Sequence, residues 1–275
     1  MPNTEIKLKI KFTGADARNH RLDFYDAAFS LYGFARALHI TMDLFVNKRV
    51  IKKATSSKNF KGYMLPSNEG SFEQEIIFYI EQAIVPAIVG GAAYDFIKYI
   101  FKCAISPRRP RLTHELSRMH TEYEPYFDKI QDVIKSPLLD AHRVIQTQSS
   151  TQISLIAEKD NASYPLVKFN NETYNYLSQK NNNDDILEEH GNITKYNVLT
   201  KNGRVYLDSY GHVISFTLDK DISDVAQKLI TLSLHNRNKG IPDILNIRYK
   251  RILSANNKIV KIIIVDCTEL PDTPL

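Results

Sequence analysis

Residues 76–105 read IIFYIEQAIVPAIVGGAAYDFIKYIFKCAI, and this apolar stretch, rich in small residues, decides how the chain is organised. Its centre, residues 82–94, carries no charge, and Ala83, Ala87 and Gly91 recur at intervals of four. At that spacing small side chains line one face of a helix, where they let a second helix approach closely. A spanning helix needs about 20 apolar residues, so the segment is borderline between a surface helix and a membrane anchor.

Charged residues follow this uncharged centre. Asp95 is three residues from Lys98, so the two can pair on a helix. In lipid such charges would face a pore or a partner helix, whereas in a soluble assembly they would form the polar stripe of a helix buried in an oligomer. Both interpretations stay open. The candidate residues of this oligomer or membrane helix are Ala83, Ala87, Gly90, Gly91, Asp95 and Lys98.

The residues before this segment predict an α+β module. Residues 5–12 alternate between apolar and lysine side chains, which is typical of a half-buried strand. Three further strands are predicted at about 49–55, 60–65 and 71–79, before a helix over 80–104. We expect a mostly antiparallel sheet with a helix packed on one face.

That packed helix is predicted over residues 23–46, with Asp23 as its cap. Tyr25, Phe29 and Tyr32 follow helical spacing along it. Gly33 lies in its interior, where glycine costs roughly 1 kcal/mol relative to alanine. We therefore predict that Gly33 packs closely against a neighbouring element.

Beyond residue 105, SPRRPR (106–111) predicts a linker, followed by an amphipathic helix over 111–135 that Pro125 would bend. Pro137 is expected to open another short helix, and 152–158 and 165–169 to form strands. The polar tract QKNNNDD (179–185) indicates a loop or linker.

The last ninety residues predict a compact β-rich module. Asn202-Gly203 is typical of a hairpin, and a helix is expected over 222–235, capped by Asp221. Val225, Leu229 and Leu232 share one face of that helix. With strands at 244–253 and 259–266, the pattern predicts a small five-stranded β-barrel. The predicted fold class is α+β. The predicted domains are an α+β module at 1–105, a helical connector at 106–150 and a β-rich module at 151–275.

The net charge of +5 is unevenly distributed. Residues 1–111 contain 17 Lys and Arg and 10 Asp and Glu, which gives +7, whereas residues 112–275 contain 19 and 21, which gives −2. An anionic partner such as nucleic acid or a lipid surface is therefore expected on the first part, although a solvated basic face explains the charge equally well. The candidate nucleic-acid or anion-binding residues are Lys48, Arg49, Lys52, Lys53, Lys58, Lys61, Arg108, Arg109 and Arg111. Aromatic residues near Phe60 and Tyr63 would support base stacking.

Motifs of catalysis are missing from the sequence. Its eight histidines are scattered without an HExxH pair, and neither a glycine-rich phosphate loop nor a GxSxG elbow occurs. Cys103 and Cys267 are too far apart in sequence to indicate a disulfide framework or a zinc site. The first twelve residues show no apolar signal-peptide core. We expect no metal, no cofactor and no enzymatic activity, and a cytoplasmic protein.

SLYGFARALHI (30–40), GSFE (70–73) and GGAAYDFIKYIF (90–101), followed by a β-rich module, resemble an uncharacterised bacterial family associated with phage-defence loci. The architecture is also similar to that of the membrane effectors of the Hailong antiphage system. The resemblance implies an oligomer whose membrane activity is restrained by single-stranded DNA oligomers, which a partner nucleotidyltransferase makes.

Two functions follow as hypotheses. The first is a non-enzymatic, homo-oligomeric effector of antiphage defence that disrupts the inner membrane and is held inactive by a nucleic-acid ligand. Here residues 76–105 would contact membrane lipid. The alternative is a soluble oligomeric nucleic-acid-binding or adaptor protein without membrane activity.

Overall fold

The computed structural model describes residues 3–54, 57–66, 72–81, 90–160, 162–240 and 244–269. The chain forms two compact units, Met1–Ser178 and Gln179–Leu275, each with its own hydrophobic core. The first unit contains β1 (Asn3–Thr13), η1 (Ala15–Asn19), α1 (Phe24–Asn47), β2 (Phe60–Met64), β3 (Glu73–Glu81), α2 (Gly90–Ile105), α3 (His114–Ala141), α4 (Arg143–Gln146), β4 (Gln152–Lys159), β5 (Ala162–Phe169) and α5 (Asn171–Ser178).

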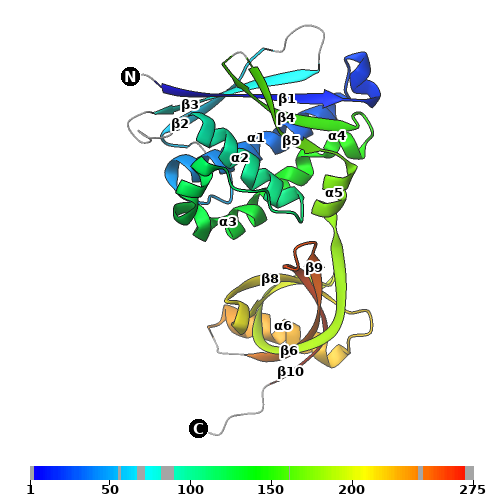
Figure 1. Ribbon diagram of the computed structural model, residues 1–275. Coiled ribbons are helices and arrows are strands. Elements are labelled where there is room, and N and C mark those ends of the chain that lie inside the picture. The colour runs from blue at the N-terminus through cyan, green and yellow to red at the C-terminus, as the bar shows by residue number, and fades with distance from the viewer. Residues whose placement is uncertain are drawn as a thin grey trace. The chain divides into compact units, whose positions relative to one another are not determined.

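The first unit is an antiparallel sheet with strand order β2-β3-β1-β4-β5, and helices cover one of its faces (Figure 1). The predicted alternation in β1 is confirmed, because Ile6, Leu8 and Ile10 are fully or almost fully buried in the core. On the other face, Lys9 Nζ lies 3.3 Å from carboxylate oxygens of Glu73 and Glu158. The expected α+β architecture is thus present.

Helix α1 begins as predicted, since the Asp23 carboxylate accepts a hydrogen bond from the Asp26 backbone N–H. The expectation for Gly33 is also confirmed. A Cβ atom at Gly33 would lie 2.3 Å from the Ala141 backbone nitrogen and 2.6 Å from the Pro137 carbonyl oxygen. Glycine therefore lets α1 and α3 pack backbone against backbone.

The boundary between strand and helix within the apolar segment 76–105 differs from the prediction. Strand β3 continues to Glu81, because its residues pair with β1 as far as Asn3, and α2 begins only at Gly90. A helix starting at residue 80 is therefore wrong. Ala83 and Ala87 lie outside the described residues.

Helix α2 lies inside the core of the first unit. Ala93, Phe96, Ile97, Ile100 and Phe101 are completely buried. Tyr94 anchors the helix to the sheet, because its hydroxyl accepts from the Lys7 backbone N–H at 3.0 Å and donates to the Glu158 carbonyl at 3.1 Å. This burial raises the pKa of Tyr94.

Two other predictions for the first unit were wrong. Residues 49–54 form a loop and not a strand. Helix α3 runs through Pro125 and Pro137 to Ala141, so Pro137 does not open a separate helix. Both prolines are accommodated because tertiary contacts, including those of α3 with α1, compensate for the lost backbone bonds.

The boundary between the units also differs. We assigned 151–178 to the C-terminal module, but β4 pairs with β1 and β5 pairs with β4 in the first sheet. The polar tract 179–185 was predicted as a loop or linker. It begins strand β6, in which Asn181 pairs with Leu253 of β9.

The second unit is a closed barrel with an inserted helix, as predicted. It contains β6 (Lys180–Asn197), β7 (Asn202–Leu207), η2 (Asp208–Tyr210), β8 (His212–Leu218), α6 (Asp224–Asn238), β9 (Leu245–Ser254) and β10 (Ile259–Glu269). The strand order around the barrel is β10-β8-β7-β6-β9. The β6–β7 turn occupies residues 198–201, so Asn202-Gly203 opens β7 instead of forming the turn.

Helix α6 is capped by Ser223, whose hydroxyl accepts from the Ala226 N–H at 3.1 Å, and not by Asp221. Its buried face carries Ala226, Ile230 and Ser233. Val225 and Leu232, which share the predicted apolar face, are 66% and 44% exposed.

Candidate nucleic-acid interface

The pairing of its strands shows which known fold the barrel of the second unit can be compared with. Strand β6 pairs with both β7 and β9, β8 pairs with β10 in parallel, and α6 lies between β8 and β9 in sequence. This is the connectivity of the oligonucleotide/oligosaccharide-binding fold, whose ligands lie over the second and third strands. A fold alone does not establish a function. The function therefore has to be argued from the side chains on the corresponding face, which β7 and β8 form.

Strands β7 and β8 alternate cleanly between core and surface. Val205, Leu207 and Phe216 are fully buried. The outward positions, which we call the β7–β8 face, are Asn202, Arg204, Tyr206, Val213, Ser215 and Thr217, with Lys195 of β6 and Lys261 of β10 beside them. The pairing register places Arg204 directly between Ser215 on β8 and Lys195 on β6.

The β7–β8 face is positively charged. Neither β7 nor β8 contains an Asp or Glu residue. Arg204 and Lys195 are exposed, and in the described parts of the chain no hydrogen bond or ion pair engages their side-chain charges. Lys261 reaches the same face, because its Nζ donates to Asn202 Oδ1 at 2.8 Å. Three cations thus lie on a surface where they can contact phosphates.

Tyr206 adds an aromatic group to these cations. It is half-buried and lies opposite Val213 on β8 and Asn192 on β6, two positions along β7 from Arg204. Aromatic side chains beside cations are the means by which proteins bind single-stranded nucleic acid, with bases on the rings and phosphates on the cations. The face can therefore bind a strand without reading its sequence.

Sequence reasoning missed this face. The second part of the chain has a net charge of −2, which directed attention to the first part. The local signal was present in residues 202–207, NGRVYL, where Arg204 and Tyr206 alternate with buried Val205 and Leu207. Only the cross-strand pairing brings Lys195 and Lys261 beside them.

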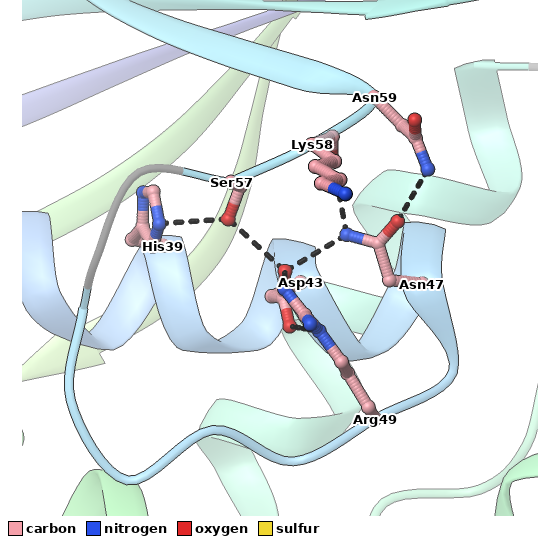
Figure 2. Close-up of polar contacts among 7 residues, drawn as sticks. All are labelled: His39, Asp43, Asn47, Arg49, Ser57, Lys58 and Asn59. Carbon is pink, nitrogen blue, oxygen red and sulfur yellow. Dashed lines mark hydrogen bonds and ion pairs between the residues drawn. The ribbon is translucent and has the colours of Figure 1, made fainter.

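The sequence predicted a basic cluster spread over two strands. In the structure most of its residues lie in the loop after α1 instead. Arg49 is already engaged, since its guanidinium donates to both carboxylate oxygens of buried Asp43 at 2.8 and 3.2 Å (Figure 2). Asn47 donates to the same carboxylate at 2.8 Å and to the Lys58 carbonyl at 3.1 Å. These contacts fasten the loop after α1 to the helix itself.

Ser57 and His39 complete this network (Figure 2). Ser57 Oγ lies 2.9 Å from His39 Nε2 and 3.0 Å from Asp43 Oδ1. A carboxylate only accepts, so the single hydroxyl proton goes to Asp43 and the His39 N–H donates to Ser57. A nucleophilic serine needs the histidine to take its proton. The arrangement therefore holds the loop and does not activate Ser57.

The charge of Asp43 is stabilised in the interior. Burial alone would raise its pKa, but the hydrogen bonds from Arg49, Asn47 and Ser57 outweigh burial and hold the pKa below its ordinary value. Asp43 consequently stays ionised and paired, and Arg49 is not available to an outside anion.

The other predicted cations remain on the surface. Lys48 pairs with Glu122. Lys52, Lys53, Lys58 and Lys61 are exposed. Arg108, Arg109 and Arg111 are exposed after α2, and Arg109 lies 3.9 Å from Asp128.

Lys61 borders a surface groove of about 640 Å³ at the β2–β3 edge of the sheet. Tyr63 and Tyr79 line the same groove, with ring centroids 5.8 Å apart in an edge-to-face arrangement. The exposed Glu81 carboxylate also lines it. The charges of the groove are therefore balanced, unlike those of the β7–β8 face.

The remaining predicted residues belong to α2. Gly90 opens the helix. A Cβ atom added at Gly91 would lie 3.3 Å from Glu115 Oε2. Asp95 and Lys98 are partly exposed, and within the described residues no ion pair joins them. None of the described helices combines the length and apolar character that crossing a bilayer requires. Among the described side chains, no three His, Cys, Asp or Glu residues gather as a metal site.

Comparison with known proteins gives two partial matches. Residues 8–109 match a domain of unknown function (DUF7946), and residues 185–268 match a family of unknown function (DUF7947). No curated protein and no solved structure matches the chain. The second match covers most of the barrel, including β7 and β8, and the first ends shortly after α2.

Proposed function

We propose that this protein binds single-stranded nucleic acid through the β7–β8 face of its barrel, as a cytoplasmic binding protein and not as an enzyme. The observation that carries the proposal is that Arg204 and Tyr206 of β7 lie beside Lys195 of β6, on a face whose strands β7 and β8 contain no carboxylate. Cations supply the salt-dependent part of the affinity, and the ring supplies stacking.

The exposed lysines of the first unit are a second basic surface. Lys52, Lys53 and Lys58 are presented by the loop that Asp43 fastens. They carry charge without a neighbouring exposed aromatic in the same loop. We propose that they add non-specific attraction for the same ligand, while the β7–β8 face holds it.

The experiment is a titration of the 275-residue chain into a short fluorescein-labelled single DNA strand, followed by fluorescence anisotropy over a series of salt concentrations. For contacts to single strands, log K falls with log salt by about 0.7 per phosphate contact. The R204Q/K195Q variant should therefore weaken binding and reduce this slope by about 1.4. The Tyr206→Ala variant should weaken binding by roughly 5- to 150-fold, from the loss of one stacked base.

The matched control is K52Q/K53Q, which removes the same charge from the first unit. We expect it to weaken binding much less than R204Q/K195Q. Equal losses in both double variants, or binding that does not respond to salt, would contradict the proposal. A role in phage defence, together with restraint by an oligomer from a nucleotidyltransferase, stays a prediction from the resemblance.

A further inference from the structure

Strand β2 forms one edge of the first sheet, and within the described residues no other strand pairs with its outer side. The Glu81 N–H donates to the Asn59 carbonyl at 3.0 Å, which fixes the phase of the ladder with β3. Because hydrogen bonds alternate along an antiparallel pair, the odd-numbered residues of β2 bond to β3. The backbone N–H and C=O groups of Phe60, Gly62 and Met64 therefore point to the free edge.

The opposite edge of the sheet, β5, is protected against pairing with another chain. Pro165 lies within β5, and the ladder with β4 is irregular where Ile156 pairs with it. Proline and irregular pairing are two means by which proteins block an edge strand. Strand β2 contains no proline, and its ladder with β3 is regular from Phe60 to Met64. Of the two edges, β2 is therefore the one open to a further strand.

The surface groove at this edge has a volume of about 640 Å³, which lies within the range usual for ligand sites. Tyr63 and Met64 line it and are 50% and 69% exposed, and Ile77 lines it as well. The side chains of a strand alternate between its two faces. A strand added beside β2 would therefore place every second side chain next to Tyr63, at this groove.

The chemistry of the edge identifies its occupant as an extended peptide. A row of unpaired N–H and C=O groups matches the backbone of another strand, whereas a helix uses these groups internally. Lys61 and Glu81 line the groove with opposite charges, so the occupant needs no net charge. A nucleic acid carries a charge on every phosphate and would gain from neither feature.

We propose that the free edge of β2 binds an extended segment of a partner protein, which joins the sheet as an additional strand. The backbone groups of β2 supply the hydrogen bonds, and the groove takes an apolar side chain of the segment. Because the charges of the groove cancel, this binding depends little on salt, unlike the binding of nucleic acid to the β7–β8 face. The site belongs to the first unit and does not rest on the proposed function.

The first test is amide hydrogen exchange of the isotope-labelled chain, followed by NMR. In the free protein the amides of Gly62 and Met64 should exchange fast, and those of Lys61 and Tyr63, which bond to β3, should exchange slowly. A short peptide in which valine and threonine alternate should slow the exchange of Gly62 and Met64. The same peptide with every amide methylated has no N–H to donate, and should not slow it.

Three outcomes of this test would overturn the proposal. Slow exchange of Gly62 and Met64 in the free protein at every concentration would mean that another part of the chain covers the edge. Protection that rises with protein concentration alone would mean that a second copy is the occupant. A lack of protection at high concentrations of the unmethylated peptide would mean that the edge does not accept a strand.

The second test is the affinity for the same peptide, labelled with fluorescein and measured by fluorescence anisotropy. Met64→Pro removes one N–H from the edge, at a position where an edge strand tolerates proline. It should weaken binding by roughly 2- to 13-fold, as expected for one lost hydrogen bond. Tyr63→Ser keeps every backbone group and should weaken binding by up to about 5-fold, through the loss of a cross-strand contact.

The matched control is Tyr164→Ser on the protected edge strand β5, where the side chain is 53% exposed. It should bind the peptide as the wild type does. Circular dichroism shows whether each variant is folded, and Tyr63→Ser carries the test if Met64→Pro is not. Equal affinities of Tyr63→Ser and Tyr164→Ser, or peptide binding that weakens steeply with salt, would contradict the proposal.

Discussion

His142 lies at the end of α3 with its ring inside the core of the first unit. Its exposed fraction is 0%. Nδ1 donates to the Leu138 carbonyl at 2.6 Å, and Nε2 lies 2.8 Å from Thr173 Oγ1. Burial lowers the pKa of His142 from 6.5 to about 4, and the hydrogen bond to Leu138 only partly opposes this effect. The folded protein therefore keeps this imidazole neutral where an unfolded chain would protonate it.

This difference predicts a pH dependence of stability. Between pH 6.5 and about 4 the unfolded state binds more protons than the folded state, so stability falls as the pH is lowered through this window. At 1.36 kcal/mol per pKa unit, the loss from His142 is about 3 kcal/mol. Urea unfolding at a series of pH values should show it. The His142→Gln variant should have a flatter profile in this window, whereas His20→Gln, at an exposed position, should behave as the wild type.

At the scale of single residues, features that depend on the local sequence could be predicted, whereas contacts that form only when the chain folds back could not. The cap at Asp23 was predictable because it depends on a residue three positions away. The close packing of Gly33 was predictable because glycine inside a helix costs stability unless it permits such a contact. The pairing of Arg49 with Asp43 was not, since it requires the chain to fold back after α1. Arg204 and Lys195 are nine residues apart in sequence and meet only through the strand register.

At the scale of elements, the contact between α1 and α3 depends on Gly33. A Cβ there would clash with backbone atoms of Ala141 and Pro137, which cannot move aside as a flexible side chain can. Ser30 also donates to the Ala141 carbonyl at this contact. We expect Gly33→Ala to destabilise the protein by about 2 kcal/mol, because overpacking outweighs the better helix propensity of alanine. Thermal unfolding would measure the loss.

A matched change in the same helix separates packing from propensity. Ala28 is exposed on α1, so Ala28→Gly should cost only about 1 kcal/mol through helix propensity. Adding a methyl group at position 33 should therefore harm stability more than removing one at position 28. If Gly33→Ala instead raised the melting temperature, the close approach of α1 and α3 would be refuted.

Element boundaries were the least predictable feature, for identifiable reasons. The strand predicted at 71–79 is present, but Ile80 and Glu81 were assigned to the following helix, and the ladder with β1 places both of them in the strand. Residues 180–183 are polar and would suit a loop, but pairing with β9 makes them a strand. The barrel itself was predictable, because its strands alternate and are separated by turn residues. Its connectivity, which carries the functional argument, was not.

At the scale of the whole molecule, the burial of α2 bears on the membrane hypothesis. Its apolar side chains contact α3, the sheet and α5 within the first unit. To enter a bilayer, Phe96, Ile97 and Phe101 would have to leave this core, and burying each such side chain stabilises the fold by roughly 1.5–3 kcal/mol. Insertion therefore requires the first unit to open, and not only the loss of a ligand from the surface.

The last prediction is that the folded protein does not release dye from anionic liposomes, either before or after nuclease treatment. Nuclease would remove nucleic acid from the β7–β8 face, which belongs to the second unit, whereas the apolar side chains of α2 are held in the core of the first unit. The control is the Gly33→Ala variant near its melting temperature, where the first unit opens and α2 can reach lipid. Dye release by the wild type only after nuclease treatment, at a temperature where circular dichroism shows it folded, would contradict this prediction. That outcome would favour the nucleic-acid-gated membrane effector instead, because removing a ligand from the surface would then suffice to free α2.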